Sequence, residues 1–214
     1  MRPVEQPGRG RDYGWRDAAP PDSCALLEDA VLAELEIWNR SGRHRLVDLG
    51  CGNGSFGRRA IASGWEVVGV EPSDDGCRMA QANGIGVIQG SAYDADLVAR
   101  CGGPFPCAVS TEVVEHLYFP RLWAKSLHDL LEPGGIAVVT TPYHGYWKNL
   151  ALALSGRLES HFHVLWDHGH IKFFSRRTLT ILLQDAGFDL LRFRRLGRIP
   201  PLAKSMLLVV RRRT

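Results

Sequence analysis

Short apolar runs alternate along this chain with segments whose apolar positions recur at helical spacing. The runs predict strands over 45–49, 66–70, 86–89, 107–111 and 135–140, and the other segments predict helices near 55–63, 75–83, 93–100 and 115–132. Pro133-Gly134-Gly135 is expected to end the last of these helices and turn the chain into the fifth strand. Strands and helices that alternate in this way predict βαβ units and a parallel sheet.

Further elements are predicted on both sides of this alternating region. Asp22 or Ser23 is placed to cap a helix that runs to about Asn39, and Ser175 is placed to cap a helix that ends before Gly187. Two β-like runs follow, over 188–196 and 206–212. Two strands in succession after five β/α units predict a terminal β-hairpin on the sheet.

The chain of 214 residues fits one domain, over 1–214, with a flexible N-terminal arm over 1–21 and an aromatic, histidine-rich insert over 142–174. Its apolar content of 45% is ordinary for a globular protein, and no apolar run approaches the roughly 20 residues of a membrane span. The N-terminus lacks a signal-peptide pattern. Five cysteines without a CxxC pair argue for reduced thiols and against a zinc module. We therefore expect a cytoplasmic protein.

The net charge of +3 is unevenly distributed. Residues 190–214 contain eight basic residues and no acidic one, so the rest of the chain contains 18 basic and 23 acidic residues. This Arg-rich C-terminal edge, with the apolar residues Leu196, Ile199, Leu202 and Met206, suggests peripheral contact with an anionic membrane surface, or with nucleic acid. The alternative is a solvated edge hairpin whose charges discourage aggregation.

The segment Leu46-Val47-Asp48-Leu49-Gly50-Cys51-Gly52-Asn53-Gly54-Ser55-Phe56-Gly57 carries the strongest functional signal. Closely spaced glycines between a strand and a helix let the backbone approach a nucleotide-like ligand. Starting at Gly52, the segment reads GxGxxG with Glu71 nineteen residues on, which is the dinucleotide pattern. Starting at Asp48, it reads DxGxGxG, and the acid suits a ligand with a cationic end, such as an α-ammonium group.

In this second frame the segment resembles the first motif of class I S-adenosylmethionine-dependent methyltransferases. The resemblance continues in register to about residue 141, through 110–116 and Leu131-Glu132-Pro133-Gly134-Gly135. It implies a Rossmann-like, doubly wound, mostly parallel seven-stranded sheet with helices on both faces. It also implies S-adenosylmethionine as the cofactor, with Glu71 accepting both ribose hydroxyls and Ser91 and Ala92 beside the adenine. The cofactor-binding residues implied in this way, together with the acid and the glycines of the turn, are Asp48, Gly50, Gly52, Gly54, Glu71, Ser91, Ala92 and Thr111.

The insert over 142–174 holds five of the eight histidines. A metal site, a pocket that carries a general base, and a folded loop whose histidines bond the backbone are all compatible with this pattern. Transfer to a hydroxyl requires removal of its proton by a group such as histidine. Our ranking of the base is His168, then His144, then His163.

A second candidate cluster follows the fourth strand. Glu112, Glu115 and His116 form an ExxEH pattern, which on a helix places the three side chains on one face. The pattern resembles O-methyltransferases of quinone biosynthesis, some of which use such a triplet for a divalent cation. The alternative is a packing role in the wall of the cofactor site, and the metal is left unassigned.

Three functions compete. The first is methyl transfer to a small-molecule acceptor, most simply a hydroxyl of an aromatic or lipophilic compound. The second is nucleic-acid methylation. Enzymes that methylate the amino groups of bases commonly carry an Asn/Asp-Pro-Pro-aromatic turn after the fourth strand, and this chain has Ser110-Thr111-Glu112-Val113 there instead, which argues against this function. The third is a non-catalytic cofactor-binding module, against which the intact turn with Asp48 and Glu71 argues. If the glycine segment is instead a dinucleotide-binding turn, the chain should bind NAD.

Overall fold

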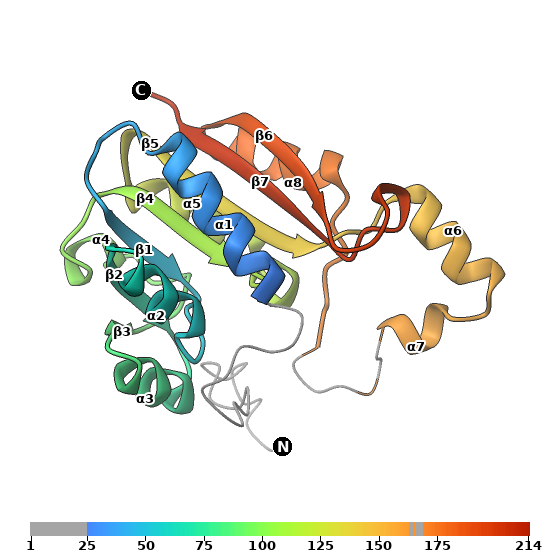
Figure 1. The fold of residues 1–214 in the computed structure, drawn as a ribbon, viewed down its shortest axis with the longest axis horizontal. Helices are drawn as coiled ribbons and strands as arrows, with labels where there is room; N and C mark the ends of the chain where they lie inside the picture. Colours follow the sequence, from blue (N-terminus) through green and yellow to red (C-terminus); the bar gives the residue numbers. More distant parts are fainter. Residues whose placement is uncertain (1–24, 163–164, 166–168) are drawn as a thin grey trace, which may run out of the picture.

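The computed structural model of this chain describes residues 25–162, 165 and 169–214. They build one seven-stranded sheet with the strand order β3-β2-β1-β4-β5-β7-β6 (Figure 1). The strands are β1 Arg45–Leu49, β2 Glu66–Glu71, β3 Gly86–Gln89, β4 Phe105–Thr111, β5 Leu131–Pro142, β6 Phe188–Leu196 and β7 Ser205–Arg212. The first five are parallel, and β7 runs antiparallel between β5 and β6. The predicted mostly parallel sheet with a C-terminal hairpin is confirmed.

Helices cover both faces of the sheet. The helical elements of the described residues are α1 Ala25–Trp38, α2 Ser55–Ala62, α3 Asp74–Ala82, α4 Leu97–Arg100, η1 Val114–His116, α5 Pro120–Asp129, α6 Tyr146–Leu154, α7 Leu158–Phe162, α8 Arg176–Asp185 and η2 Pro200–Leu202. One apolar layer joins the sheet to α1, α2 and α3, and a second joins it to α4, α5 and α8. Alternate residues of a strand enter opposite layers: Leu46 packs in the first and Val47 in the second.

Two predicted helices differ in the structure. The helix expected over 115–132 is divided into η1 and α5, because Phe119 precedes a proline and has φ −117° and ψ 71°, outside the helical region. Pro120 then starts α5, and α5 ends at Asp129. Pro133-Gly134-Gly135 therefore lies inside β5 rather than at a helix end, beside a register shift between Phe105 and Cys107 of β4. The helix expected over 93–100 is reduced to α4.

The Arg-rich C-terminal edge is largely engaged within the fold. Arg192 and Arg194 pair with Glu34 of α1, whose side chain is fully buried. Arg212 donates to the carbonyl oxygens of His128 and Leu131, and Arg213 pairs with Asp189. Of the apolar residues expected at a lipid surface, Leu196 and Met206 are buried in the core and only Ile199 is strongly exposed. The prediction of an apolar contact surface on this edge is therefore wrong for Leu196 and Met206.

The insert departs from the sheet after β5. Helices α6 and α7 project from the body of the molecule beyond the ends of β5 and β7 (Figure 1). The segment over 169–172 returns to the body, where the backbone N–H groups of Ile171 and Lys172 both donate to the carbonyl oxygen of Glu115 at 2.9 Å. Among the described residues, no helix combines the length and the apolar character that a membrane crossing requires.

Candidate functional site

The glycine turn joins β1 to α2 at the carboxyl edge of the parallel strands. Gly50, Gly52 and Gly54 have φ values of 91°, 53° and 78°, which L side chains rarely adopt. A β-carbon on Gly50 would lie 2.5 Å from a methyl carbon of Val113, and one on Gly54 would lie 2.8 Å from the Cα of Ala80. The turn thus needs glycine both for its backbone conformation and for its close packing.

Asp48 is buried beneath this turn. Its side chain is 1% exposed, and its Oδ1 has no hydrogen-bond partner among the described residues. Burial, together with the charges of Glu71 and Glu28, raises the pKa of Asp48 to about 8. A buried carboxylate oxygen without a partner costs free energy, and a cationic group of a ligand would offset that cost.

Glu71 ends β2 and is held against the glycine turn. Its Oε2 accepts from the backbone N–H of Gly52 at 3.0 Å, and its Oε1 accepts from the N–H and the hydroxyl of Ser73 at 3.0 and 2.6 Å. A carboxylate offers about four acceptor positions. The anchored Glu71 therefore keeps lone pairs for a diol such as a ribose.

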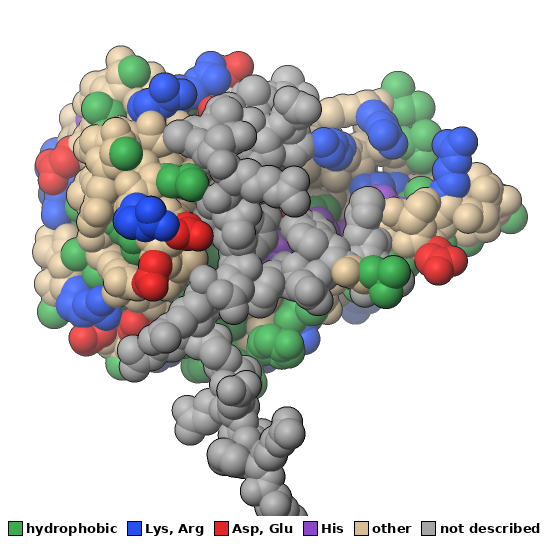
Figure 2. Space-filling view, turned by 90° about the horizontal axis from the view of Figure 1, so that it is seen from below, with side chains coloured by type: hydrophobic (Ala, Val, Ile, Leu, Met, Phe, Trp, Pro, Cys, Tyr) green, Lys and Arg blue, Asp and Glu red, His purple; other side chains and the backbone are tan. Residues whose placement is uncertain are grey.

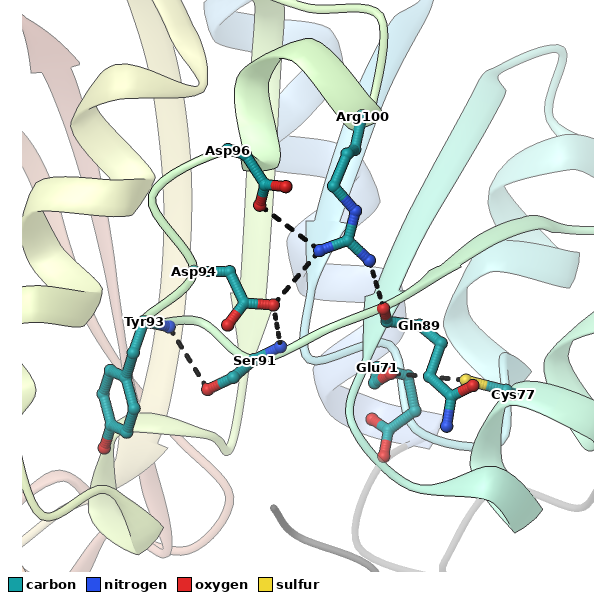
Figure 3. Close-up of polar contacts among 8 residues, drawn as sticks. All are labelled: Glu71, Cys77, Gln89, Ser91, Tyr93, Asp94, Asp96 and Arg100. Carbon is teal, nitrogen blue, oxygen red and sulfur yellow. Dashed lines mark hydrogen bonds and ion pairs between the residues drawn. The ribbon is translucent and has the colours of Figure 1, made fainter.

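The segment after β3 forms a tight polar turn (Figure 3). The hydroxyl of Ser91 accepts from the N–H of Tyr93 at 3.2 Å, and Asp94 accepts from the N–H of Ser91 at 3.0 Å. Arg100 of α4 holds Asp94 and the carbonyl oxygen of Gln89. Ala92 lies beside this turn and packs against the core. Ser91 and Ala92 therefore lie just beyond the end of β3, at the same sheet edge as Asp48 and Glu71.

Thr111 ends β4 and pairs with Thr140 of β5, so it completes this edge of the sheet. The single helix expected to carry the ExxEH pattern is not formed, although the charge of Glu112 still acts on Glu115. Glu112 has φ 54°, and only Glu115 and His116 belong to η1. The backbone N–H of Glu112 donates to Oγ1 of Thr140 at 3.2 Å, and Oε1 of its carboxylate is buried without a hydrogen-bond partner among the described residues, with Lys148 and Lys204 as nearby cations.

Burial raises the pKa of Glu112 to about 7. Lys148 of α6 is a buried cation that the sequence pattern did not single out. Its Nζ donates to the carbonyl oxygens of Tyr143 at 2.8 Å and Lys204 at 3.4 Å. Burial and the charge of Arg198 lower its pKa to about 8.

His144 follows β5 and lies in an aromatic cluster. Its ring centre is 5.1 Å from that of Phe173, 5.6 Å from that of His161 and 6.1 Å from that of Phe162. The residue is 7% exposed, and no hydrogen bond of its Nδ1 is found among the described residues. Burial, followed by the positive charges of Lys148 and His161, lowers its pKa to about 4. The other two candidates for the base, His168 and His163, lie outside the described residues.

Glu28 of α1 is a further site residue that the sequence pattern missed. It is 5% exposed, accepts from the hydroxyl of Ser55 at 2.9 Å and contributes to the raised pKa of Asp48. Nothing in its spacing distinguishes it from a solvated acid of an amphipathic helix. Its burial results from the packing of α1 against α2, which only the fold reveals.

The comparison with protein families gives one match that covers most of the chain. The methyltransferase domain family matches residues 21–192. This chain belongs to that family. The prediction of a class I methyltransferase fold is confirmed, and the frame of the glycine turn that begins at Asp48 is the one that applies.

Two curated relatives of this methyltransferase domain are ubiquinone biosynthesis O-methyltransferases. The protein from Ruegeria pomeroyi is 31% identical over 152 residues, which are 68% of this chain and 60% of the relative. The protein from Caulobacter vibrioides is 31% identical over 147 residues, 64% of this chain and 57% of the relative. The matched region thus spans about 60% of the length of these relatives. The resemblance to quinone-pathway enzymes is confirmed.

Solved structures show the same fold. Magnesium protoporphyrin IX methyltransferase from Synechocystis, with bound SAH, has a TM-score of 0.67 at 16% identity and covers 87% of this chain and 82% of its own. A SAM-dependent methyltransferase from Archaeoglobus fulgidus has a TM-score of 0.66 at 16% identity, over 88% of this chain and 94% of its own. At this identity the likeness concerns the fold alone.

Proposed function

We propose that this methyltransferase domain binds S-adenosylmethionine at the glycine turn and transfers the methyl group to a hydroxyl oxygen of a small aromatic or lipophilic molecule. The observation that carries the proposal is the buried Asp48, with an unpartnered oxygen, beside the anchored carboxylate of Glu71. An unpartnered acid suits a cationic ligand, and a preorganised carboxylate suits a diol. S-adenosylmethionine has both features.

Each residue at this edge has a role in holding the cofactor. Asp48 faces the cationic amino-acid end, Glu71 accepts from the ribose hydroxyls, and Ser91 and Ala92 lie beside the adenine. Gly50, Gly52 and Gly54 provide the backbone surface that a side chain would obstruct. Thr111 lies next to the reacting end, because β4 neighbours β1 at the centre of the sheet.

The aromatic cluster after β5 supports an aromatic acceptor. Phe162 and Phe173 offer ring faces and edges around His144, and a planar acceptor packs well against such surfaces. The curated relatives are named O-methyltransferases, which supports oxygen as the accepting atom. Nucleic acid is the less favoured acceptor, because several arginines of the C-terminal edge are engaged within the fold.

The chemistry requires alignment more than activation. The cofactor supplies a methyl group on a sulfonium centre, which is already a good leaving group. The acceptor oxygen forms a bond to the methyl carbon while the carbon–sulfur bond breaks, and the electron pair of that bond stays on sulfur. The hydroxyl proton becomes strongly acidic as the bond forms, and we assign its removal to Nδ1 of His144. A site that holds the acceptor at about 3–3.5 Å and excludes water provides most of the rate.

The test is methyl transfer from labelled S-adenosylmethionine to a panel of catechols and quinone precursors. Analogues with every hydroxyl already methylated serve as controls. We expect label in the hydroxyl-bearing compounds only. Transfer to RNA with no transfer to any small molecule would support the nucleic-acid alternative. Failure to bind S-adenosylmethionine in calorimetry would overturn the proposal, and NAD binding in the same experiment would favour the dinucleotide interpretation.

We also propose that the domain contacts an anionic membrane surface, with α6 rather than the Arg-rich edge as the main contact. Tyr146, Trp147 and Leu154 are exposed by 73%, 64% and 80%, and residues 142–157 contain no acid. Hydrophobic side chains and Lys or Arg side chains lie together on this projection (Figure 2). Lys148, the only basic residue of α6, is buried, so the contact would rest on the exposed aromatic and aliphatic side chains, with the exposed Arg157 after the helix as the nearby positive charge.

Flotation with vesicles that contain anionic lipid tests this surface. We expect Trp147→Ser to reduce the bound fraction and the matched control Trp65→Phe, at a buried ring, to leave it unchanged. Equal binding of Trp147→Ser and the parent chain would contradict this part of the proposal.

A further inference from the structure

Glu28 is a second buried acid near Asp48, and none of the cofactor contacts proposed above involves it. It belongs to the first turn of α1 and is 5% exposed. Figure 1 shows the beginning of α1 close to the carboxyl ends of the parallel strands. The two acids therefore reach the same edge of the sheet from different elements, Asp48 from β1 and Glu28 from a helix that covers the sheet.

The carboxylate of Glu28 is held by the residue that follows the glycine turn. Its Oε1 accepts from the hydroxyl of Ser55 at 2.9 Å, and Ser55 is the first residue of α2, directly after Gly54. Burial, then the charge of Glu71 and that of Glu28, raise the pKa of Asp48. Glu28 thus lies at the end of the glycine turn, within electrostatic reach of Asp48 and of a ligand bound in the turn.

The packing of α1 against α2 does not explain why this acid is buried. Arg59 of α2 pairs with Asp29, the next residue of α1, whose side chain is 65% exposed. Nη1 of Arg59 lies 3.7 Å from Oε2 of Glu28, which is beyond hydrogen-bond distance. A solvated carboxylate would serve this contact equally well. Burial of one acid near another costs free energy, and like-charge pairs of this kind are concentrated at functional sites.

A cationic group bound near both acids would turn their repulsion into attraction. Oδ1 of Asp48 has no hydrogen-bond partner among the described residues, and Ser55 leaves acceptor positions of Glu28 open. An ammonium group has three donors and a full positive charge, so it can donate to both carboxylates.

We propose that Glu28 is a second counter-ion, alongside Asp48, for the ammonium group of S-adenosylmethionine, and that the two acids select ligands which carry this group. The inference rests on the proposed function. S-adenosylhomocysteine, the product of methyl transfer, also carries the ammonium group. 5′-Methylthioadenosine keeps the adenine, the ribose and the sulfur but lacks the amino-acid end. Glu28 therefore contributes to the binding of the cofactor and its product, and not to the binding of 5′-methylthioadenosine.

Calorimetry of the full chain with these three ligands tests the assignment, at about pH 8.5, where most of Asp48 is ionised in the free protein. Glu28→Gln keeps an acceptor for Ser55 and removes the charge. It should weaken the binding of S-adenosylmethionine and S-adenosylhomocysteine by about tenfold and leave 5′-methylthioadenosine within about twofold of the parent chain. Asp29→Asn, which removes a charge from the neighbouring exposed residue, is the matched control and should retain all three parental affinities.

Ser55→Ala gives a second test, which applies even where Glu28→Gln does not fold. It keeps the charge of Glu28 but removes the hydroxyl that holds it, so S-adenosylhomocysteine should bind about threefold more weakly and 5′-methylthioadenosine should bind as before. Parental affinity for S-adenosylhomocysteine in Glu28→Gln, or in Ser55→Ala where only this variant folds, would overturn the inference.

An equal loss for S-adenosylhomocysteine and 5′-methylthioadenosine would also overturn it, because the role of Glu28 would then be structural. Binding of neither S-adenosylmethionine nor S-adenosylhomocysteine by the parent chain would refute the proposed function together with this inference. Parental binding of both that Glu28→Gln leaves unaffected would refute this inference alone.

Discussion

Oε2 of Glu71 accepts a hydrogen bond from the backbone N–H of Gly52 at 3.0 Å, which ties the end of β2 to the glycine turn after β1. Ser73 donates twice to the other carboxylate oxygen. Three hydrogen bonds thus fix this side chain without using all of its acceptor positions. The acid that ends β2 is preorganised for a ligand before any ligand arrives.

The first prediction concerns this acid. Glu71→Gln replaces one acceptor oxygen with an NH₂ group that faces the donors of Gly52 or Ser73. Hydrogen bonds to a charged group contribute about 1.5–3 kcal/mol, so S-adenosylmethionine affinity should fall by about 10- to 100-fold in calorimetry. Glu66→Gln, on the exposed end of the same strand, is the control and should bind as the parent chain does. Equal affinities of the two variants would reject the assigned role of Glu71.

The second prediction follows from the raised pKa of Asp48, about 8 in the folded protein. A cationic group favours the carboxylate, so binding below that pH releases a proton. S-adenosylmethionine affinity should therefore increase as the pH rises toward about 8 and then level off. Asp48→Asn removes the titrating group, and its affinity should be lower and independent of pH over that range. Calorimetry in two buffers of different ionisation enthalpy measures the released proton.

The raised pKa of Asp48 also predicts how the free energy of unfolding depends on pH. Its folded pKa lies above the unfolded value of 3.8, so the native state binds more protons between these values. The free energy of unfolding without cofactor should then decrease as the pH rises through this window, by at most about 1.4 kcal/mol per pH unit from Asp48. Thermal melts of Asp48→Asn should show a weaker decrease. A parental slope in this variant would show that other groups cause it.

The third prediction concerns the basic edge. Arg192 and Arg194 both pair with the fully buried Glu34. Removal of one arginine therefore leaves the acid paired with the other. Each single alanine variant should lose about 1–2 kcal/mol of unfolding free energy, and the double variant about 3–5 kcal/mol, because a buried charge then remains unpaired. Denaturant unfolding measures these values. Arg121→Ala, which removes a surface pair with Asp185, is the control and should cost less than about 1 kcal/mol.

Local sequence signals accounted for the sheet and for the cofactor edge of the site. The apolar run over 45–49 and the glycines after it are local features. Where a turn requires positive φ, the sequence contains glycine, so the turn can be recognised without knowledge of distant contacts. Asp48 and Glu71 were identifiable because each lies in a buried strand, where a lone acid is costly without a partner.

The acceptor side depends on contacts between distant segments, which spacing alone does not reveal. Glu112 was expected on a helix with Glu115, but the chain turns through a left-handed residue and the helix breaks before Pro120. His170 lies beside His116 only because the main chain of the insert bonds to η1. Burial of Lys148 likewise results from the packing of α6 at the end of β5 and β7.

The last prediction concerns His144, the described candidate for the base. Removal of a general base usually lowers the rate by about 10²- to 10⁴-fold. His144→Ala should therefore lower kcat by such a factor and leave the calorimetric affinity for S-adenosylmethionine unchanged, since the ring lies after β5 rather than at the glycine turn. His44→Ala, at an exposed site, is the control.

The pH profile gives an independent check of this assignment. The base acts in its neutral form, and its pKa of about 4 means that kcat should decrease only as the pH falls toward that value. An inflection near about 6.5, the value of an unperturbed histidine, would instead indicate a solvated residue. Parental activity in a variant with alanine at both His144 and His168 would exclude both as the base, and the proton would then leave through another group or through water.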